Sequence, residues 1–496
     1  MSIMTDVVLA LYFVTVLWLA TYGTASLVNI VLYWRSKRRG YQSGDGPPLP
    51  KEWPSVTIQL PVFNEKYTVE RLLEAVTRLN YPRELLQIQV LDDSTDDTTE
   101  LIRRLVDAYK SQAINVELLH RTNRAGYKAG ALQDAFPSAT GELIGIFDAD
   151  FVPEPDWLGR TVPLFVNPRL GCLQTRWGHT NRKYNALTRE EALAIDAHFI
   201  VEQSARSGNG LFLNFNGTAG LWRRACIEDA GGWQHDTLTE DLDLSYRAQL
   251  AGWKIDYLPD VIVPAELPSQ VEAFKKQQFR WAKGSFQVVR KLLPAVLRRK
   301  DLSRGVKAMA ALHLTGYMVH PLMLALLVLT LPVGVLAPIA FKILPFTFVA
   351  GFGPPLMCLV AEGRRSPTLA ERIRMLPLMT ITGFGISLST SVAVIQGLLG
   401  TGGNHFTRTP KLNEGEVKRH KRIDQSYLEP VSPLVWGEIV LGVYALATGM
   451  LLEPALGLQI MPWMLIYAMG YFYVAGLNLA QHATAGGGRQ KEPLVA

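Results

Sequence analysis

Residues 86–97 read LQIQVLDDSTDD, and residues 143–150 read LIGIFDAD. Each stretch is an apolar run that ends in a cluster of aspartates, and apolar runs of about four to eight residues are typical of buried strands. In open α/β sheets, ligands bind outside the carboxyl ends of the strands. The two acidic clusters therefore predict a site at the strand ends for a divalent cation and a phosphorylated ligand.

The surrounding residues, from 55 to about 304, alternate short apolar runs with amphipathic stretches. This alternation implies a mainly parallel sheet with right-handed crossovers. Residues 61–65 read PVFNE rather than a glycine-rich phosphate turn, which excludes a dinucleotide-binding dehydrogenase. Asp96 and Asp97 are expected to cap the helix that follows them. The predicted strands cover residues 56–60, 86–91, 116–119 and 143–147, and the predicted helices cover residues 69–79, 98–109, 130–136 and 242–251.

Length and composition indicate a soluble domain joined to a membrane region. The chain has 496 residues, 48% of them hydrophobic, and a formal net charge of +6. The basic residues cluster beside apolar stretches, as in the cytoplasmic flanks of membrane helices, and no nucleic-acid recognition module accompanies them. We therefore expect a lipid bilayer, and no nucleic acid, as a partner. Cys172, Cys226 and Cys358 lie far apart and form no zinc pattern or disulfide framework, so we expect three buried thiols.

The first membrane span is marked by residues 7–34, which contain no Asp, Glu, Lys or Arg. This stretch is too long for a signal peptide, and no basic region precedes it. Basic residues then cluster in residues 35–39, and positively charged flanks stay in the cytoplasm. We therefore expect the N-terminus outside and the chain after residue 39 inside.

Two further apolar regions are expected to add four spans, which makes five in all. Residues 376–400 are also apolar, but basic segments flank them on both sides, so we predict an interfacial or re-entrant helix there. The predicted order is a first span in 1–39, a linker in 40–54, a cytoplasmic α/β domain in 55–304, two spans in 305–362, cytoplasmic helices and a loop in 363–432, two spans in 433–482 and a cytoplasmic tail in 483–496.

Two more motifs follow the acidic clusters: Thr239-Glu240-Asp241 and, at residues 277–281, QQFRW. The whole set, in this order, resembles the processive-type family-2 glycosyltransferases of the cellulose synthase superfamily. The resemblance implies a GT-A (Rossmann-like) α/β fold and an inverting enzyme that uses UDP-Glc or GDP-Man to extend a β-linked polysaccharide of glucan, mannan or glucomannan type. The chain looks most like the cellulose synthase-like A mannan and glucomannan synthases at residues 124–132, 147–151, 155–158, 215–220 and 230–233.

By this resemblance, several segments build the donor site. Hard divalent cations take oxygen ligands and bridge to phosphates, so Mg²⁺ or Mn²⁺ is expected at Asp150, with Asp148 holding the metal or the ribose. Arg121, Arg124 and above all Lys128 are expected to contact the phosphates and the nucleotide near a helix start, and a solvated basic loop is the alternative. The other residues implied for the nucleotide are Pro61, Asn64, Glu65, Asp92, Asp93 and Arg280, with Arg408 and Lys411 in a mobile loop that covers it.

The resemblance also implies an acceptor side. Asp241 is expected to be the general base that takes the proton from the acceptor hydroxyl, with Thr239 and Glu240 placing the acceptor. A simple helix cap is the alternative for this motif. Asn216 and Gly217 are implied to lie in a loop that faces the acceptor.

The QQFRW motif is expected to present one helical face to the substrates. Gln277, Arg280 and Trp281 share that face because they stand at positions i, i+3 and i+4. The flat ring of Trp281 suits stacking on a sugar, and Arg280 suits the leaving diphosphate. An amphipathic helix beside the membrane is the alternative.

Some alternatives stay open at this point. Thr239 stands where the plant A-type synthases usually have Val, and residues 408–410 read RTP in place of Val-Thr-Glu, so both UDP-Glc and GDP-Man are candidate donors. Lipid glycosyltransferases that act on ceramide or diacylglycerol share these motifs, and an inactive membrane scaffold is a further alternative. We expect a plasma or inner membrane, or a Golgi membrane in a eukaryote, and the sequence does not indicate the oligomeric state.

Overall fold

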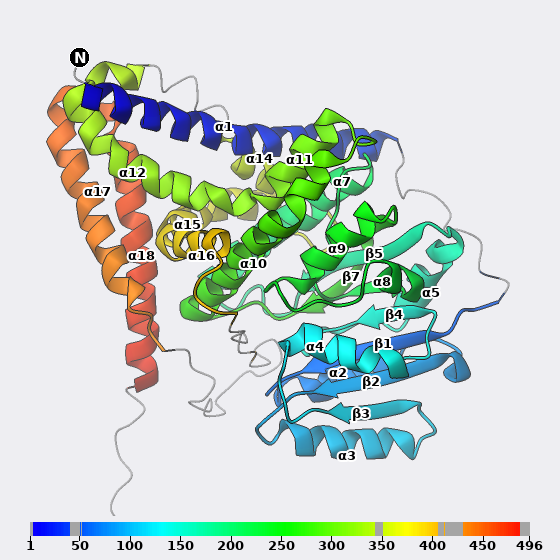
Figure 1. Cartoon of the computed structure of the whole chain (residues 1–496). Coiled ribbons are helices and arrows are strands. Elements are labelled where there is room, and N and C mark those ends of the chain that lie inside the picture. The colour runs from blue at the N-terminus through cyan, green and yellow to red at the C-terminus, as the bar shows by residue number, and fades with distance from the viewer. Residues whose placement is uncertain are drawn as a thin grey trace, which may run out of the picture.

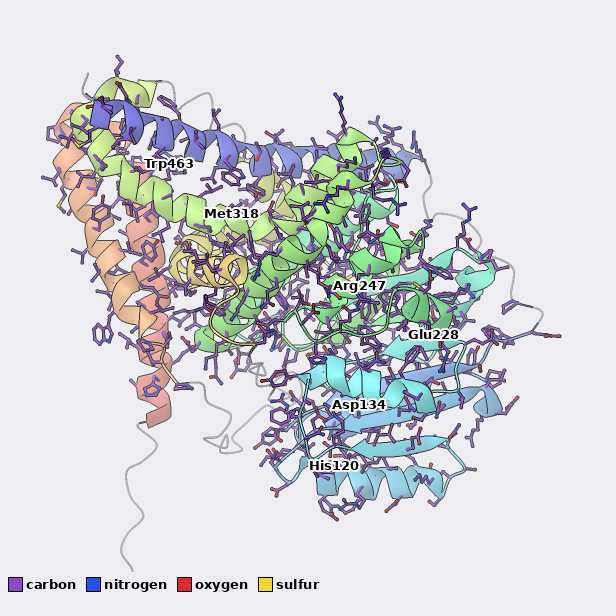
Figure 2. All side chains as sticks on the ribbon, in the orientation of Figure 1. His120, Asp134, Glu228, Arg247, Met318 and Trp463 are labelled. Atoms are coloured by element: carbon purple, nitrogen blue, oxygen red, sulfur yellow. The ribbon has the colours of Figure 1, made fainter. Side chains whose placement is uncertain are left out.

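The computed structural model describes residues 3–39, 50, 52–342, 351–404, 411 and 430–486. Figure 1 shows an α/β part built on one sheet and, beside it, a group of long helices. Helix α1 (Ile3–Arg38) runs along the top of both parts in that view. Figure 2 places Met318 and Trp463 among the long helices and His120 at the far end of the α/β part.

The α/β part is organised around a seven-stranded sheet with the order β3-β2-β1-β4-β6-β5-β7. All four predicted strands are present, each within two residues of its predicted bounds. The prediction of a mainly parallel sheet is confirmed, and only β6 runs antiparallel to its neighbours β4 and β5. The strands are β1 (Val56–Val62), β2 (Leu86–Asp92), β3 (Val116–His120), β4 (Leu143–Ile146), β5 (Leu170–His179), β6 (Gly220–Arg223) and β7 (Lys254–Ala265).

Helices cover both faces of the sheet, because successive strand residues point to opposite faces. In β4, Leu143 belongs to a core shared with α2 and α3, whereas Ile144 and Ile146 belong to a second core shared with α4 and α9. The helices of this part are α2 (Val69–Thr77), α3 (Thr98–Lys110), α4 (Tyr127–Ala135), α5 (Trp157–Thr161), α6 (Ala186–Asp196), α7 (Ser204–Ser207), α8 (Arg224–Asp229) and α9 (Glu240–Leu250).

The predicted cap of α3 is half right. Asp96 Oδ1 accepts a hydrogen bond from the Thr98 amide at 3.0 Å, as a capping aspartate does. The Asp97 side chain makes no capping hydrogen bond. A capping side chain needs an extended backbone at its own residue, and the backbone of Asp97 is already helical, with φ −63° and ψ −6°.

The two acidic clusters meet at one edge because three strands end together. Val62 at the end of β1 is paired with Asp92 at the end of β2. Ile146 at the end of β4 is paired with Gln59 of β1, and the next amide, that of Phe147, donates to the Gln59 carbonyl. The chain that carries the second cluster therefore leaves the sheet beside the last residues of β1. This confirms that both clusters lie at the carboxyl edge of the sheet.

Long apolar helices make up the second part. In the described ranges, four helices are long and apolar enough to cross a membrane, at residues 3–38, 316–336, 434–456 and 461–483. Because residues 343–350 lie outside those ranges, the second span expected in 305–362 stays a prediction. The helices are α10 (Val271–Arg298), α11 (Arg304–Leu314), α12 (Val319–Leu336), α14 (Gly353–Val360), α15 (Leu369–Gly385), α16 (Ser387–Leu399), α17 (Leu434–Leu456) and α18 (Met461–Gly486).

The apolar segment 376–400 folds as parts of two helices rather than as one straight helix. α15 and α16 meet at Ile386, and their axes differ by 50°. A pair bent this far is either a broken span or a re-entrant loop, and the basic flanks favour the second arrangement. The re-entrant helix stays a prediction.

Cysteine labelling tests this prediction. Because basic segments stay in the cytoplasm, an Asn413→Cys protein is expected to react with a membrane-impermeant maleimide only after cells are permeabilised. Residue 413 lies outside the described residues, and the three native cysteines are buried. A Gln459→Cys protein is the control, since Gln459 is exposed between α17 and α18 and should react in intact cells. Reaction of the Asn413→Cys protein in intact cells would contradict the five-span arrangement.

A buried polar cluster joins α10 to the α17–α18 hairpin. Lys275 Nζ of α10 lies 2.6 Å from Glu438 Oε1 of α17 and 3.7 Å from Glu272 Oε2. Asn478 of α18 donates to Glu272 Oε2 at 2.6 Å. The Lys275 and Glu438 side chains are 3% and 0% exposed. Loss of one partner of such a pair leaves an uncompensated buried charge, so the helix that carries QQFRW is firmly tied to this hairpin.

Candidate active site

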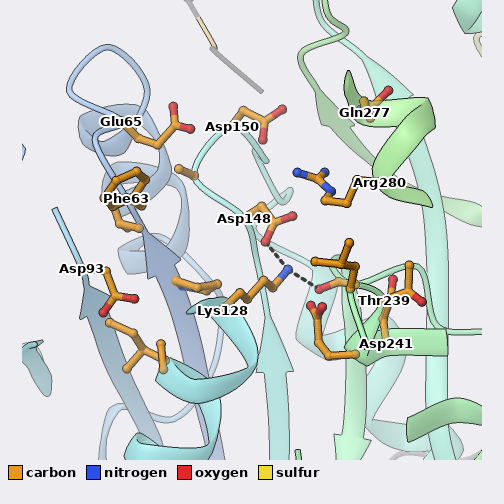
Figure 3. Close-up of a pocket in the computed structure, with 18 of the residues that line it drawn as sticks. Phe63, Glu65, Asp93, Lys128, Asp148, Asp150, Thr239, Asp241, Gln277 and Arg280 are labelled. Atoms are coloured by element: carbon orange, nitrogen blue, oxygen red, sulfur yellow. Dashed lines mark hydrogen bonds and ion pairs between the residues drawn. The ribbon is translucent and has the colours of Figure 1, made fainter. Parts of the chain in front are cut away.

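A cleft with an empty volume of about 1120 Å³ opens at the carboxyl edge of the sheet (Figure 3). Asn64 and Asp92 do not line it, and Arg408 lies outside the described residues. The predicted site residues that do line it are Pro61, Glu65, Asp93, Arg124, Lys128, Asp148, Asp150, Asn216, Gly217, Thr239, Glu240, Asp241, Gln277, Arg280, Trp281 and Lys411. The fold thus collects segments that are far apart in the sequence into one site.

Lys128 lies at the centre of this cleft. It stands in the first turn of α4, after Gly126, whose φ of +68° favours glycine. Its Nζ donates to Asp148 Oδ1 at 2.5 Å (Figure 3) and to the Gly217 carbonyl at 2.8 Å. Burial opposes the charge of this group, but Asp148 and Glu240 outweigh burial and raise the Lys128 pKa. A charged ammonium is therefore held near a helix start, where a phosphate group can meet it.

Asp92 has a different role from the predicted one. Its side chain is fully buried, and its carboxylate accepts hydrogen bonds from Ser94 N at 3.0 Å and Thr99 Oγ1 at 2.7 Å. The same carboxylate lies 2.8 Å from His120 Nδ1, at the end of β3 (Figure 2). These contacts correct the expectation that Asp92 binds the donor. Asp92 instead ties the ends of β2 and β3 to the start of α3.

Asp93 lines the cleft and is held by Arg121, a residue of the basic loop that was expected to contact the phosphates or the nucleotide. Arg121 donates from Nε to Asp93 Oδ1 at 2.8 Å and from Nη2 to Asp93 Oδ2 at 2.6 Å. This bidentate pair fixes the plane of the carboxylate. Each carboxylate oxygen keeps a further lone pair, which suits Asp93 to the hydroxyls of a ribose or the N–H groups of a base. Arg121 belongs to the same basic loop as Arg124, and residue type alone did not separate their roles.

Arg124 and Phe63 form a flat wall of the cleft. The guanidinium carbon of Arg124 lies 3.2 Å from the centroid of the Phe63 ring, so the two groups are stacked. Flat aromatic and guanidinium surfaces are stacking partners for nucleobases. The neighbouring Asn64 has a φ of +55°, and its Oδ1 accepts a hydrogen bond from Thr95 N at 2.8 Å. Asn64 therefore shapes the turn after β1, and its contact with the nucleotide stays a prediction.

Asp148 and Asp150 project into the cleft and suit a divalent cation (Figure 3). Asp150 Oδ2 lies 3.0 Å from Lys411 Nζ and accepts a hydrogen bond from Glu266 N at 2.9 Å. Within the described ranges, no group of three or more His, Cys, Asp or Glu side chains is placed to hold a metal. A cation here would take two carboxylates from the protein and its other ligands from phosphate oxygens and water, which is how Mg²⁺ is usually bound. The residues present therefore fit a nucleotide-bound cation.

Asp241 stands in the first turn of α9, on the opposite side of Lys128 from Asp93 (Figure 3). Burial, and after it the neighbouring Glu240, raises the pKa of Asp241 to about 7. Gly217 makes room for this carboxylate: it has a φ of +85°, and a Cβ there would lie 3.0 Å from Asp241 Oδ2. Because the Gly217 carbonyl also binds Lys128, this one residue connects the cationic group with the expected base.

The QQFRW residues enter the cleft from the start of α10. Gln277, Arg280 and Trp281 all line it, as their helical spacing predicted, and the Arg280 guanidinium points into it (Figure 3). One turn later, a Cβ at Gly284 would lie 2.5 Å from Thr239 Cγ2. This close contact between α10 and the start of α9 sets the distance between the two motifs.

Trp177 of β5 also lines the cleft and was not predicted. Its ring packs against Phe151 and Phe199, with centroid distances of 5.4 Å and 5.2 Å. β5 carries no acidic cluster and was not predicted as a strand, so no local signal marked this residue. Trp177 and Trp281 together give the cleft two indole rings, whose flat apolar faces suit pyranose rings.

Comparisons with known proteins identify the family of this chain. Residues 54–284 match the family described as "Glycosyltransferase like family 2". The probable glucomannan 4-beta-mannosyltransferase 7 of Oryza sativa subsp. japonica is 36% identical over 388 residues, which are 76% of this chain and 65% of that protein. The glucomannan 4-beta-mannosyltransferase 7 of Arabidopsis thaliana is 33% identical over 440 residues, which are 86% of this chain and 77% of that protein.

A solved structure shares the fold. It is the mannosyltransferase PcManGT from Pyrobaculum calidifontis, in complex with GDP-Man and Mn²⁺, with 22% identity and a TM-score of 0.51. The alignment covers 80% of this chain and 100% of that one. This likeness confirms the predicted GT-A fold. The chain spans about two thirds of the rice relative and more of the Arabidopsis one. Together with the presence of Asp148-Ala149-Asp150, Thr239-Glu240-Asp241 and QQFRW in a single cleft, these relations show that the chain belongs to the family-2 glycosyltransferases, among the relatives of the glucomannan 4-beta-mannosyltransferases.

Proposed function

We propose that this glycosyltransferase transfers mannose from GDP-mannose to the end of a β-linked, glucomannan-type polysaccharide, with inversion at the anomeric carbon. The observation that carries the proposal is the arrangement around Gly217, which places the Asp241 carboxylate beside the Lys128–Asp148 pair. Sugar transfer from a nucleoside diphosphate requires a base that takes the proton of the acceptor and a positive group that binds the diphosphate. The Asp241 carboxylate and the Lys128 ammonium stand on the two sides of Gly217 and can fill these roles. The names of the relatives support mannose as the sugar and glucomannan as the product.

The donor is held by groups that recognise its separate parts. Asp93, oriented by Arg121, accepts hydrogen bonds from the ribose or base, and the base stacks beside the Arg124–Phe63 wall. Lys128 and Arg280 bind the diphosphate and stabilise its charge as the leaving group departs. A divalent cation held at Asp148 and Asp150 would add charge neutralisation of the diphosphate.

The acceptor reacts on the other side of the cleft. Trp281 and Trp177 stack on the sugar rings, and Asp241 takes the proton from the attacking hydroxyl. The oxygen then forms a bond to the anomeric carbon while the bond to the diphosphate breaks on the opposite side, which inverts the configuration. Such a base contributes about 10²–10⁴-fold to the rate.

The rate is expected to fall in mild acid. Asp241 acts as a carboxylate, and because burial and Glu240 raise its pKa to about 7, it is protonated at a pH where an ordinary aspartate is ionised. The value of kcat/KM should therefore drop about tenfold for each pH unit below about 7. Initial rates measured between about pH 5 and about pH 9 test this expectation, with tryptophan fluorescence at each pH as the control for folding. A rate that stays constant down to about pH 5 would exclude Asp241 as the titrating base.

We also infer the setting of the reaction. The four apolar helices cross a membrane, and the basic flank at residues 35–39 keeps the cleft on the cytoplasmic side. The membrane is the plasma or inner membrane, or a Golgi membrane in a eukaryotic cell. Mg²⁺ and Mn²⁺ both suit the oxygen ligands of the site.

Product analysis tests the proposed function. Purified protein in lipid nanodiscs is incubated with radiolabelled GDP-mannose, and in parallel with radiolabelled UDP-glucose, and the products are separated into insoluble polymer and lipid extract. We expect label from GDP-mannose in polymer that an endo-β-mannanase releases. Label confined to the lipid extract would establish the lipid acceptor instead. Label from UDP-glucose alone would overturn mannose as the donor sugar, and an Asp241→Asn protein serves as the blank.

A further inference from the structure

A widened helical turn lies behind the acceptor side of the cleft. Residues Ala197–Gln203 form a π-helix between α6 and α7, and π-helical turns occur frequently at functional sites. Two side chains of this turn, those of His198 and Gln203, contact Asn216, which lines the cleft directly before Gly217.

The proton on His198 is placed by Glu202. Arg206 is always charged, and its Nε donates to Glu202 Oε1 at 2.9 Å. Burial disfavours the Glu202 carboxylate, but Arg206 and His198 outweigh burial and hold its pKa well below the usual range. Glu202 Oε2, 3.0 Å from His198 Nδ1, is therefore an acceptor. In the neutral imidazole the proton then lies on Nδ1, and Nε2 keeps a lone pair.

This lone pair determines which way the Asn216 amide faces. His198 Nε2 lies 3.0 Å from Asn216 Nδ2 and 3.3 Å from Gln203 Nε2, and only N–H groups can point at a lone pair, with the Asn216 contact the shorter of the two. The Asn216 oxygen then faces Gln203, whose Nε2 donates to Asn216 Oδ1 at 2.6 Å and to the Asn214 carbonyl at 3.2 Å. One of the two Asn216 N–H groups is used by His198, and the other, which has no hydrogen-bond partner among the described residues, can serve a ligand.

The backbone at Asn216 and Gly217 joins the two sides of the cleft and is held by its own contacts. The backbone N–H of Asn216 donates to Gln174 Oε1 at 2.8 Å. The next residue, Gly217, gives its carbonyl to Lys128 and makes room for Asp241. A turn of the Asn216 side chain therefore changes what the acceptor meets without breaking the contacts on the donor side.

We propose that His198, with Glu202 behind it, is a positioning residue that turns an N–H of Asn216 toward the acceptor sugar. Asn216 then donates to a hydroxyl or ring oxygen of the sugar whose own hydroxyl is attacking. The proposal rests on the proposed function, since it assumes a sugar acceptor in this cleft. His198 itself touches Asn216 rather than the substrate, so its loss should alter acceptor use and spare the donor.

Two substitutions at position 198 separate this role from a structural one. His198→Gln places an amide oxygen where Nε2 was, because both atoms are four bonds from Cα, and so keeps an acceptor for Asn216. His198→Asn places its amide where Nδ1 was and so keeps the contact with Glu202 only. If His198 positions Asn216, the Gln protein is the mild variant. If His198 merely satisfies Glu202, the Asn protein is the mild one.

The readout is steady-state kinetics with GDP-mannose and β-1,4-linked mannotetraose, together with GDP-mannose hydrolysis in the absence of any sugar acceptor. We expect His198→Asn to raise the KM for mannotetraose about tenfold, the loss of about one hydrogen bond, while the KM for GDP-mannose and the hydrolysis rate stay within about twofold. His198→Gln should stay within about threefold of the wild type in all three. Thermal unfolding midpoints control for folding.

Other results would overturn the inference. Equal loss in both variants, a milder His198→Asn protein, or a parallel fall in hydrolysis would show a structural role. The wild type could be inactive with GDP-mannose and mannotetraose but active with UDP-glucose and cellotetraose. In that case the proposed donor is wrong, and the two position-198 variants are compared with UDP-glucose and cellotetraose instead. The failure of the proposed function is thus seen in the wild type, and the failure of this inference is seen in the difference between the two variants.

Discussion

Replacing Asp241 with asparagine is expected to slow sugar transfer by about two to four orders of magnitude. Asparagine has nearly the same shape as aspartate but cannot accept a proton, so the acceptor hydroxyl stays protonated during attack. Gly217 still leaves room for the side chain, and Lys128 keeps its contact with Asp148. The affinity for GDP-mannose, measured by calorimetry, should therefore stay close to that of the wild type.

An Asp156→Asn protein is the matched control for the loss of one carboxylate. Asp156 precedes α5, does not line the cleft, and its side chain is 57% exposed. This protein should transfer sugar at the wild-type rate. Transfer by the Asp241→Asn protein at a rate close to the control, with an intact fold, would show that another group takes the proton.

The second large effect is expected at Asp150. An Asp150→Asn protein should lose nearly all activity and bind GDP-mannose more weakly, because the neutral amide is a poor ligand for a hard divalent cation. Asparagine is preferred to alanine here because its amide oxygen still accepts the hydrogen bond from Glu266 N. Its side chain also fills the volume of the aspartate, so no cavity forms beside Lys411. Chelation with EDTA should give the same result in the wild type, and Mn²⁺ or Mg²⁺ should restore activity and donor affinity.

The control for this series is an Asp97→Asn protein, since the Asp97 side chain is exposed and makes no capping hydrogen bond. It should respond to EDTA and to Mn²⁺ as the wild type does. Full activity in chelator, or donor affinity that does not change with metal, would mean that Lys128, Arg280 and Lys411 supply the positive charge without a metal.

Much of this site was predictable because its residues stand at strand ends or at helical spacing, which can be recognised from a short stretch of sequence. Acidic residues at the ends of apolar runs lie at strand ends, and parallel strands bring those ends together, so Asp93, Asp148 and Asp150 meet in one cleft. The spacing of Gln277, Arg280 and Trp281 predicted their common face on α10 without knowledge of the fold.

Other features depend on pairing across the fold, which a single sequence does not display. Successive residues at a strand end point in opposite directions, so Asp92 and Asp93 could not both face the donor, and nothing local told which one would. The reversed strand β6 and the place of Trp177 follow from how distant segments pair. The widened turn that carries His198 has no periodic signal at all, because it departs from helical spacing.

The polar cluster between α10 and the last two helices bears on biogenesis. Lys275 and Glu272 are synthesised well before Glu438 and Asn478, so until the hairpin is made these two charges have only each other. Glu438 stands in the first turns of α17, and its pairing with Lys275 compensates a carboxylate that would otherwise be buried alone. We therefore expect α10 to reach its final packing only together with the α17–α18 hairpin. A chain that ends before α17 is therefore expected to be less stable than the full chain, because Lys275 then lacks Glu438.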